Sequence, residues 1–78
     1  MTASSPAPGI YRHYKGPLYE VSGIARHSET EEPLVVYRAL YGDYGLWCRP
    51  LSMFTEKVEH DGIVKSRFEL VKPFHHGH

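Results

Sequence analysis

Two arginines and a tryptophan in the stretch LVVYRALYGDYGLWCRP, residues 34–50, have the chemistry to bind an anionic or planar group. If residues 42–45 form a loop between two strands, Arg38 lies opposite Arg49, and Trp47 lies on the same face. Like charges that face each other across a sheet destabilise it, so this pair predicts a compensating anion. Arginine binds phosphate or carboxylate through paired N–H bonds, and tryptophan can stack on a base. The pattern therefore favours a nucleotide or a single-stranded nucleic acid as ligand.

The two arginines also allow an interpretation without a ligand. The chain's own carboxylates could neutralise Arg38 and Arg49, and Trp47 could belong to the core. The same register places Cys48 opposite Ala39, where it is expected to be a small buried hydrophobe. The candidate carboxylates are those of Glu20, Glu29, Glu31 and Glu32.

A second cluster, YRHYK at residues 11–15, interleaves aromatic and basic side chains. Proteins that bind single-stranded nucleic acid combine stacking rings with positive charge in this way, so Tyr11 and Tyr14 are expected to assist the arginine and tryptophan face. The same pattern is typical of an ordinary strand with one face in water. The neutral net charge favours this second interpretation, because it removes the usual electrostatic signature of a nucleic-acid binder.

The run His27-Ser28-Glu29 contains the residue types of a hydrolytic triad. Successive residues of an extended chain point to opposite sides, so three in a row cannot form the relay that activates a nucleophile. A non-enzymatic protein is therefore predicted, and a small enzyme that uses the loop at residues 27–30 is the remote alternative. His27 and Glu29 remain candidate ligand-binding residues, because this polar loop could border a binding site.

No cofactor is predicted, since the chain contains no Gly-rich phosphate loop, paired-carboxylate motif or nucleotide fingerprint. His75, His76 and His78 have the ligand chemistry for a divalent metal. They lie in a segment that is expected to be flexible, whereas a metal site needs fixed geometry. No physiological metal site is therefore predicted.

Nine basic and nine acidic side chains give the 78 residues a formal net charge of zero, so no global field steers the protein towards nucleic acid or an anionic membrane. The single cysteine excludes an internal disulfide. The N-terminus has neither the basic start nor the apolar run of a signal peptide, and no apolar run reaches the ~18 residues of a membrane span. A cytoplasmic protein is predicted, with no membrane association. Its expected partner is a nucleotide, a nucleic acid or another protein.

The elements that hold these residues are expected to be strands, because no stretch shows sustained helical periodicity. A bulge or bend is predicted at Gly23 and a tight turn at Asp61-Gly62. Residues 51–54 are expected to form one helical or 3₁₀ turn that carries Leu51, Met53 and Phe54 inward. The predicted strands cover residues 10–14, 18–27, 34–41, 46–49, 55–60 and 63–71.

Five or six short strands in a chain of this length predict an all-β domain, most simply a small SH3-like barrel. The domain is expected to cover residues 9–71. Residues 1–8 are rich in Ser, Ala and Pro and are predicted to be a flexible tail, as are the His-containing residues 72–78.

Several runs along the chain resemble the bacterial DUF1653 family, and together they cover residues 9–69. They are GIYRHYKG at 9–16, YEV at 19–21, ARHSET at 25–30, VVYRALYGDYGLW at 35–47, RPL at 49–51, MF at 53–54 and RF at 67–68. The chain departs from the family pattern at Cys48, where a valine-like residue is common, and at Lys65-Ser66, where Val-Pro is frequent. The resemblance implies a small bacterial, cytoplasmic protein with a compact β fold. It implies no catalytic residue.

Overall fold

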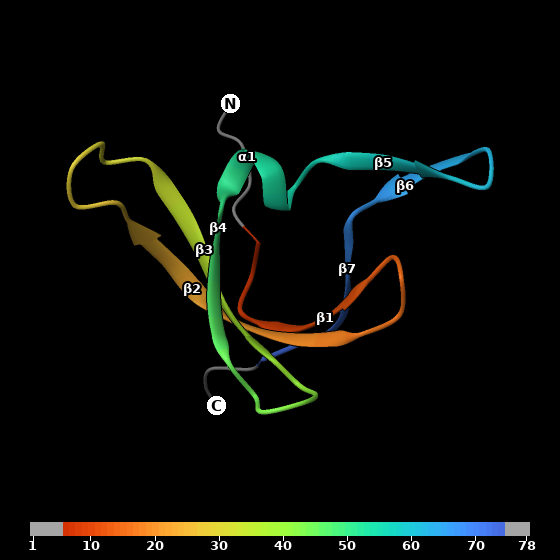
Figure 1. Ribbon diagram of the computed structural model, residues 1–78, viewed down its shortest axis with the longest axis horizontal. Helices are drawn as coiled ribbons and strands as arrows, with labels where there is room; N and C mark the ends of the chain where they lie inside the picture. Colours follow the sequence, from red (N-terminus) through yellow and green to blue (C-terminus); the bar gives the residue numbers. More distant parts are fainter. Residues whose placement is uncertain (1–5, 75–78) are drawn as a thin grey trace.

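The computed structural model describes residues 6–74, which form seven antiparallel strands in two sheets and one short helix (Figure 1). The predicted all-β class is therefore confirmed. There are more strands than expected because Arg67 interrupts the last one and divides it into β6 and β7; the SH3-like barrel stays a prediction. The strands are β1 (Gly9–His13), β2 (Leu18–Arg26), β3 (Pro33–Ala39), β4 (Leu46–Pro50), β5 (Lys57–His60), β6 (Ile63–Ser66) and β7 (Phe68–Pro73).

The larger sheet has the strand order β4-β3-β2-β1-β7, so β2 lies at its centre. The ladder between β2 and β3 shifts register between Val21 and Gly23, which confirms the predicted bulge. The half of β2 before the bulge pairs with both β1 and β3, whereas the half after it pairs with β3 alone. As a result, the far half of the β2–β3 hairpin extends away from β1 and β7 (Figure 1).

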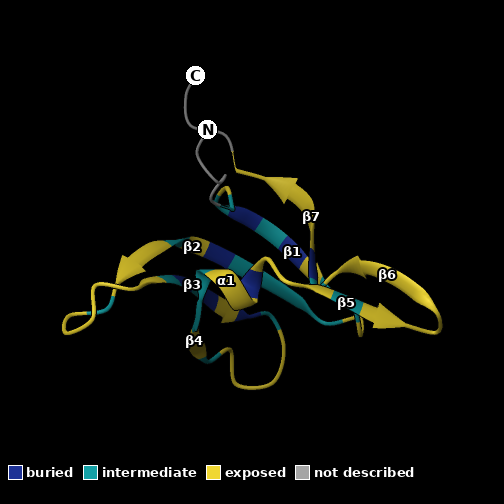
Figure 2. Ribbon diagram, turned by 90° about the horizontal axis from the view of Figure 1, so that it is seen from above, coloured by how far each residue is buried: buried dark blue, intermediate teal, exposed yellow. Residues whose placement is uncertain are grey.

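The smaller sheet is the β5–β6 hairpin, which turns at Asp61-Gly62 as predicted. Both turn residues have positive φ, 55° and 76°, the combination that matches the twist of a two-residue hairpin. At the base of the hairpin, the N–H of Arg67 donates to the carbonyl oxygen of Glu56 at 3.1 Å, and the two side chains form an ion pair at 3.1 Å. These contacts close the base of the hairpin, which is mostly exposed (Figure 2). The N–H of Tyr14 donates to the carbonyl oxygen of Arg67 at 2.9 Å and ties this base to the turn that follows β1.

The core lies between the larger sheet and helix α1 (Leu51–Phe54), which follows β4 directly. Phe54 is 2% exposed, and its ring stacks on Phe68 at 4.1 Å between centroids with only 3° between planes. Burying one such ring contributes roughly 1.5–3 kcal/mol. The buried side chains of this cluster belong to Tyr11, Val21, Val35, Tyr37, Phe54 and Phe68.

The predicted helical turn at residues 51–54 is present, but the expected inward position of Met53 is wrong. Met53 is 46% exposed, whereas Leu51 packs against the core. Residues three apart share one face of a helix, so a single turn can direct Leu51 and Phe54 inward together, while Met53 points away from the core.

The ends of the domain differ slightly from the predicted boundaries. β7 continues to Pro73, two residues past the expected end at residue 71, because Gly9 of β1 pairs with Pro73. The first part of the predicted N-terminal tail, residues 1–5, lies outside the described residues. So do the three histidines of the C-terminal segment.

The close approach of β1 and β7 at Gly9 gives a test of this pairing. A Cβ at Gly9 would lie 2.5 Å from the carbonyl oxygen of Lys72 and 2.9 Å from the Cα of Pro73, both backbone atoms that cannot rotate away. We expect Gly9→Ala to lower the free energy of unfolding by about 1–3 kcal/mol in urea denaturation. The control is Gly23→Ala, where nothing lies within 4 Å of the new Cβ. If Gly9→Ala is as stable as this control, the β1–β7 pairing is wrong.

Candidate functional site

The two arginines that were predicted to face each other lie on opposite faces of the sheet. Arg38 pairs with Leu46 across the β3–β4 ladder, and Arg49 pairs with Val35. Arg49 and Trp47, two residues apart on β4, share the core-side face as expected from strand alternation. The predicted register is therefore wrong, while the predicted neighbourhood of Arg49 and Trp47 is confirmed.

The register differs because the loop between β3 and β4 is longer than predicted. It covers residues 40–45, and the N–H of Ala39 bonds to the carbonyl oxygen of Gly45 at 2.9 Å. The N–H of Leu40 bonds instead to the carbonyl oxygen of Leu18 at 3.0 Å. Partners consequently shift by three positions, and an odd shift moves every side chain of one strand to the other face.

Arg38 has a structural contact in place of the predicted anion. Its guanidinium donates to the carbonyl oxygen of Tyr44 at 2.7 Å and so fastens the loop at residues 40–45, where Tyr44 adopts a positive φ of 60°. Glu20 is its cross-strand neighbour, yet they form no ion pair. Arg38 is thus absent from the site.

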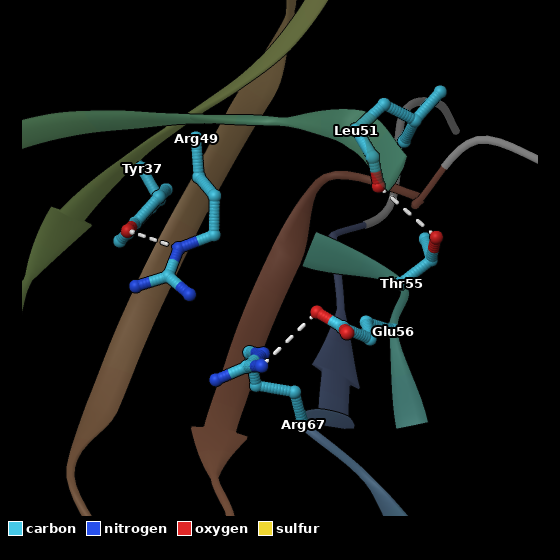
Figure 3. A network of polar contacts seen from close by, with 6 residues as sticks. All are labelled: Tyr37, Arg49, Leu51, Thr55, Glu56 and Arg67. Atoms are coloured by element: carbon cyan, nitrogen blue, oxygen red, sulfur yellow. Dashed lines mark hydrogen bonds and ion pairs between the residues drawn. The ribbon is translucent and has the colours of Figure 1, made fainter. Parts of the chain in front are cut away.

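Arg49 lies partly buried against the aromatic core. Its Nε donates to the hydroxyl of Tyr37 at 3.4 Å (Figure 3). Its guanidinium carbon lies 5.7 Å from the ring centroid of Phe68, within cation–π range. Within residues 6–74, no carboxylate oxygen approaches either Arg38 or Arg49 to 4.0 Å. The predicted neutralisation by the chain's own glutamates is therefore wrong.

Trp47 is 60% exposed, so the prediction that it belongs to the core is also wrong. It is the cross-strand partner of Tyr37. The indole lies close to the loop, because a Cβ at Gly45 would be 3.3 Å from its Nε1. The missing side chain at Gly45 leaves room for the indole.

Arg49 and Trp47 line a shallow hollow of about 190 Å³ together with three tyrosines. We call it the aromatic hollow, and its residues are Tyr19, Tyr37, Tyr41, Trp47 and Arg49. The hydroxyl oxygens of Tyr19 and Tyr41 are 2.8 Å apart, and their rings meet edge to face at 5.6 Å. Burial, with the Tyr41 hydrogen bond adding to it, raises the pKa of Tyr19 to about 12. The hollow therefore offers aromatic surfaces, hydroxyl groups and one cation.

His13 and Arg67 lie next to this hollow and were not predicted as site residues. The His13 ring meets Phe68 edge to face at 5.0 Å, and its Nδ1 accepts the N–H of Lys15 at 3.1 Å. Burial lowers the pKa of His13, and the charges of Arg49, Arg67 and Lys15 lower it further. Figure 3 shows the guanidinium groups of Arg49 and Arg67 on the same side of the sheet. Only the long-range pairing of β7 with β1 brings Arg67 here.

The two tyrosines expected to assist the site have different positions. Tyr11 is buried in the core, 6% exposed, and its hydroxyl donates to the carbonyl oxygen of Ala7 at 2.6 Å. Tyr14 follows β1, and its ring lies 4.6 Å from His13 and 5.4 Å from His60. Tyr14 lines a second, larger cavity, while neither tyrosine lines the aromatic hollow.

His27 and Glu29 lie in the β2–β3 loop, at the opposite end of β3 from the aromatic hollow (Figure 1). The Nδ1 of His27 accepts backbone N–H groups of Glu29 and Thr30 at 3.1 and 3.3 Å, so the imidazole stabilises the turn. The hydroxyl of Thr30 accepts the N–H of Glu32 at 3.2 Å and also stabilises this loop. The structure thus does not bring these residues to Arg49 and Trp47.

Cys48 is exposed and pairs with Val36, so its predicted burial opposite Ala39 is wrong for the same reason as the arginine register. In residues 6–74, no three His, Cys, Asp or Glu side chains are grouped so that they could hold a metal ion. No helix of this part of the chain has the length and apolar character needed to cross a membrane.

Comparison with known proteins identifies a family but no activity. A family model described as "Protein of unknown function (DUF1653)" matches residues 9–70. A crystal structure of a protein belonging to DUF1653 from Bordetella bronchiseptica is similar, with a TM-score of 0.81 and 38% sequence identity. The match covers 92% of this chain and 95% of that chain. Among curated proteins, no match was found.

The position of His13 predicts a specific pH dependence. Its folded pKa lies below the ordinary value of 6.5, so the unfolded chain binds the proton first as the pH falls. The stability linked to this group is thus fully present above pH 6.5 and decreases as the pH drops below it. We expect an NMR titration to place the His13 midpoint below 6.5. A midpoint at or above 6.5 would contradict the described surroundings of the ring.

Proposed function

The chain belongs to the DUF1653 family, whose function is not assigned, and we propose that it is a non-enzymatic module that binds an anionic group attached to a planar ring, such as a nucleotide. The observation that carries this proposal is the aromatic hollow. Trp47 lines it and is largely exposed, and Arg49 presents a cation without a carboxylate partner in the described chain. Stacking on the indole and a charge-assisted bond to a phosphate are interactions that these two side chains can make together.

The position of Arg49 supports binding of an anion more than a purely structural role. A guanidinium that is partly withdrawn from water without an ionic partner has a strong electrostatic preference for an incoming anion. The Phe68 ring lies against its guanidinium and the Tyr37 hydroxyl accepts from its Nε, so less side-chain freedom remains to be lost on binding. The neutral net charge provides no steering, so we expect slow association compared with strongly basic nucleic-acid binders.

The chemistry of the hollow supports a binding role more than a catalytic one. General acid–base catalysis works best when a group has a pKa near the working pH. The Tyr19 hydroxyl, with a pKa of about 12, is far from neutrality. His13 lies beside the hollow but does not line it, and none of the five lining residues is a His, Cys, Asp or Glu. We therefore propose that the protein is not an enzyme. We also expect a cytoplasmic location, with which a single exposed cysteine is compatible.

A protein partner is the second candidate, and the sheet edge at β4 favours it. β4 is the last strand of the larger sheet, and Leu46 and Trp47 on it are 58% and 60% exposed. An edge strand can accept a strand from another chain. Such a contact would be insensitive to added salt, whereas binding of a phosphate to Arg49 should weaken with salt.

The proposal is tested by titrating adenosine 5′-monophosphate into the protein and following NMR shifts at two salt concentrations. We expect saturable shifts at Tyr19, Tyr41, Trp47 and Arg49 that weaken at the higher salt concentration. Trp47→Ala should reduce affinity by roughly 1–3 kcal/mol, the usual worth of one stacked base. Trp47 is largely exposed, so this variant should keep the fold.

Arg49→Gln should remove the salt dependence, because it removes the charge that contacts the phosphate. The control is Arg26→Gln, an exposed arginine at the far end of β2, which should bind as the unmodified protein does. Absence of shifts in the aromatic hollow at millimolar ligand would contradict the proposed function.

A further inference from the structure

A second cavity, of about 400 Å³, opens near the aromatic hollow and has a different chemistry. It lies where the end of β1 and the following turn meet β6 and β7. We call it the basic cavity, and its lining residues are Arg12, His13, Tyr14, Lys65, Ser66 and Glu69. It combines two cations, an imidazole, a tyrosine ring and two hydroxyls with a single carboxylate.

The cations of the basic cavity have no ionic partner in the described chain. Arg12 is the cross-strand neighbour of Glu69, yet its NH1 donates to the carbonyl oxygen of Gly16 at 3.3 Å, and no carboxylate of residues 6–74 lies within 4.0 Å of it. The same holds for Lys65, which is exposed on β6. Two such cations in one cavity are suited to a second phosphate.

A series of adjacent rings connects the aromatic hollow to the basic cavity. The ring centroids are 5.6 Å apart for Tyr41 and Tyr19, 6.4 Å for Tyr19 and His13, and 4.6 Å for His13 and Tyr14. Tyr19 lines the hollow, Tyr14 lines the cavity, and His13 lines the cavity while contacting Tyr19. The two sites therefore adjoin where Tyr19 contacts His13. Arg12 and Glu69 of the cavity lie on the opposite face of the sheet from Tyr19.

The distribution of charge explains how a neutral chain can carry such a region. Five of the nine basic side chains lie in or beside the two sites, and three acidic ones, Glu29, Glu31 and Glu32, lie in the distant β2–β3 loop. The five basic residues are Arg12, Lys15, Arg49, Lys65 and Arg67. Of these, Arg67 is paired with Glu56, and the Nζ of Lys15 lies 5.8 Å from the ring centroid of Tyr14. Four acidic side chains, Glu56, Glu59, Asp61 and Glu69, also lie in this part of the chain, so the excess of positive charge around the two sites is small.

We propose that the aromatic hollow and the basic cavity are two parts of one path for single-stranded nucleic acid, longer than one nucleotide. This inference rests on the proposed function, since it takes the hollow as the place of one nucleotide. A base stacks on Trp47 with its phosphate at Arg49, and a phosphate further along the strand, beyond the end of β1, reaches Arg12 and Lys65. Rings that alternate with unpaired cations suit a flexible strand with a phosphate at every nucleotide and a π-face on every base.

The test compares adenosine 5′-monophosphate with oligoadenylates of two and four nucleotides, as RNA and as DNA, in NMR titrations at several salt concentrations. We expect the tetranucleotide to bind at least tenfold more tightly than the mononucleotide. The slope of log affinity against log salt should become steeper with length, by roughly 0.7 for each further phosphate neutralised. Tighter binding of RNA would indicate contact with the 2′-hydroxyl, and similar binding of both would indicate contacts with base and phosphate only. Either result supports the path.

The decisive variant is Arg12→Gln/Lys65→Gln, in which both altered residues are exposed. It should abolish the gain in affinity with length and leave mononucleotide binding in the hollow unchanged. The control, Arg26→Gln/Lys72→Gln, also removes one arginine and one lysine, at exposed positions outside both sites. It should retain the gain in affinity with length.

The outcomes separate this inference from the proposed function. If the mononucleotide binds in the hollow but the oligonucleotides bind no more tightly, the path is overturned and the proposed function stands. A gain with length that persists in Arg12→Gln/Lys65→Gln also overturns the path. If no nucleotide of any length shifts residues of the hollow, the proposed function fails as well.

Discussion

Phe68, the first residue of β7, makes the contact on which both the core and the site depend. Its ring stacks on Phe54, with 4.1 Å between centroids and 3° between ring planes, and so joins β7 to helix α1. The guanidinium carbon of Arg49 lies 5.7 Å from the centroid of the same ring. Without this ring, β7 would lose its attachment to the core, and Arg49 would lose the surface that holds it. The position of the cation is therefore a consequence of core packing.

Several aromatic residues serve both the core and the candidate site because the domain is small. A chain of this length buries only about 60% of the surface that it exposes when unfolded, so few side chains are available for function alone. Tyr37 is 5% exposed and packs against Phe54 and Phe68, while its hydroxyl accepts from Arg49. Tyr19 likewise packs against the core and lines the aromatic hollow. The walls of the candidate site are thus the outer surfaces of core residues.

Local signals in the sequence predicted most of the elements, because the residues that cause them are adjacent. The turn at Asp61-Gly62, the bulge near Gly23 and the helical turn at residues 51–54 all depend on short-range conformational preferences. The prediction of the β3–β4 register was wrong because the length of the loop depends on the hydrogen bond from Leu40 to Leu18, which no local pattern in the sequence reveals. Arg49 and Trp47 were still predicted as neighbours, since strand alternation does not depend on register. Arg67 was missed because it reaches the site only through the pairing of the first and last strands.

The central claim is that Arg49 and Trp47 act together on one ligand, and Trp47, the only tryptophan in the chain, reports on it directly. The decisive measurement is its fluorescence during titration with adenosine and, separately, with adenosine 5′-monophosphate, in the unmodified protein and in Arg49→Gln. We expect both ligands to quench the indole and the phosphate to increase affinity only when Arg49 is present. Equal affinities for the two ligands in the unmodified protein, or no quenching by either, would contradict the claim.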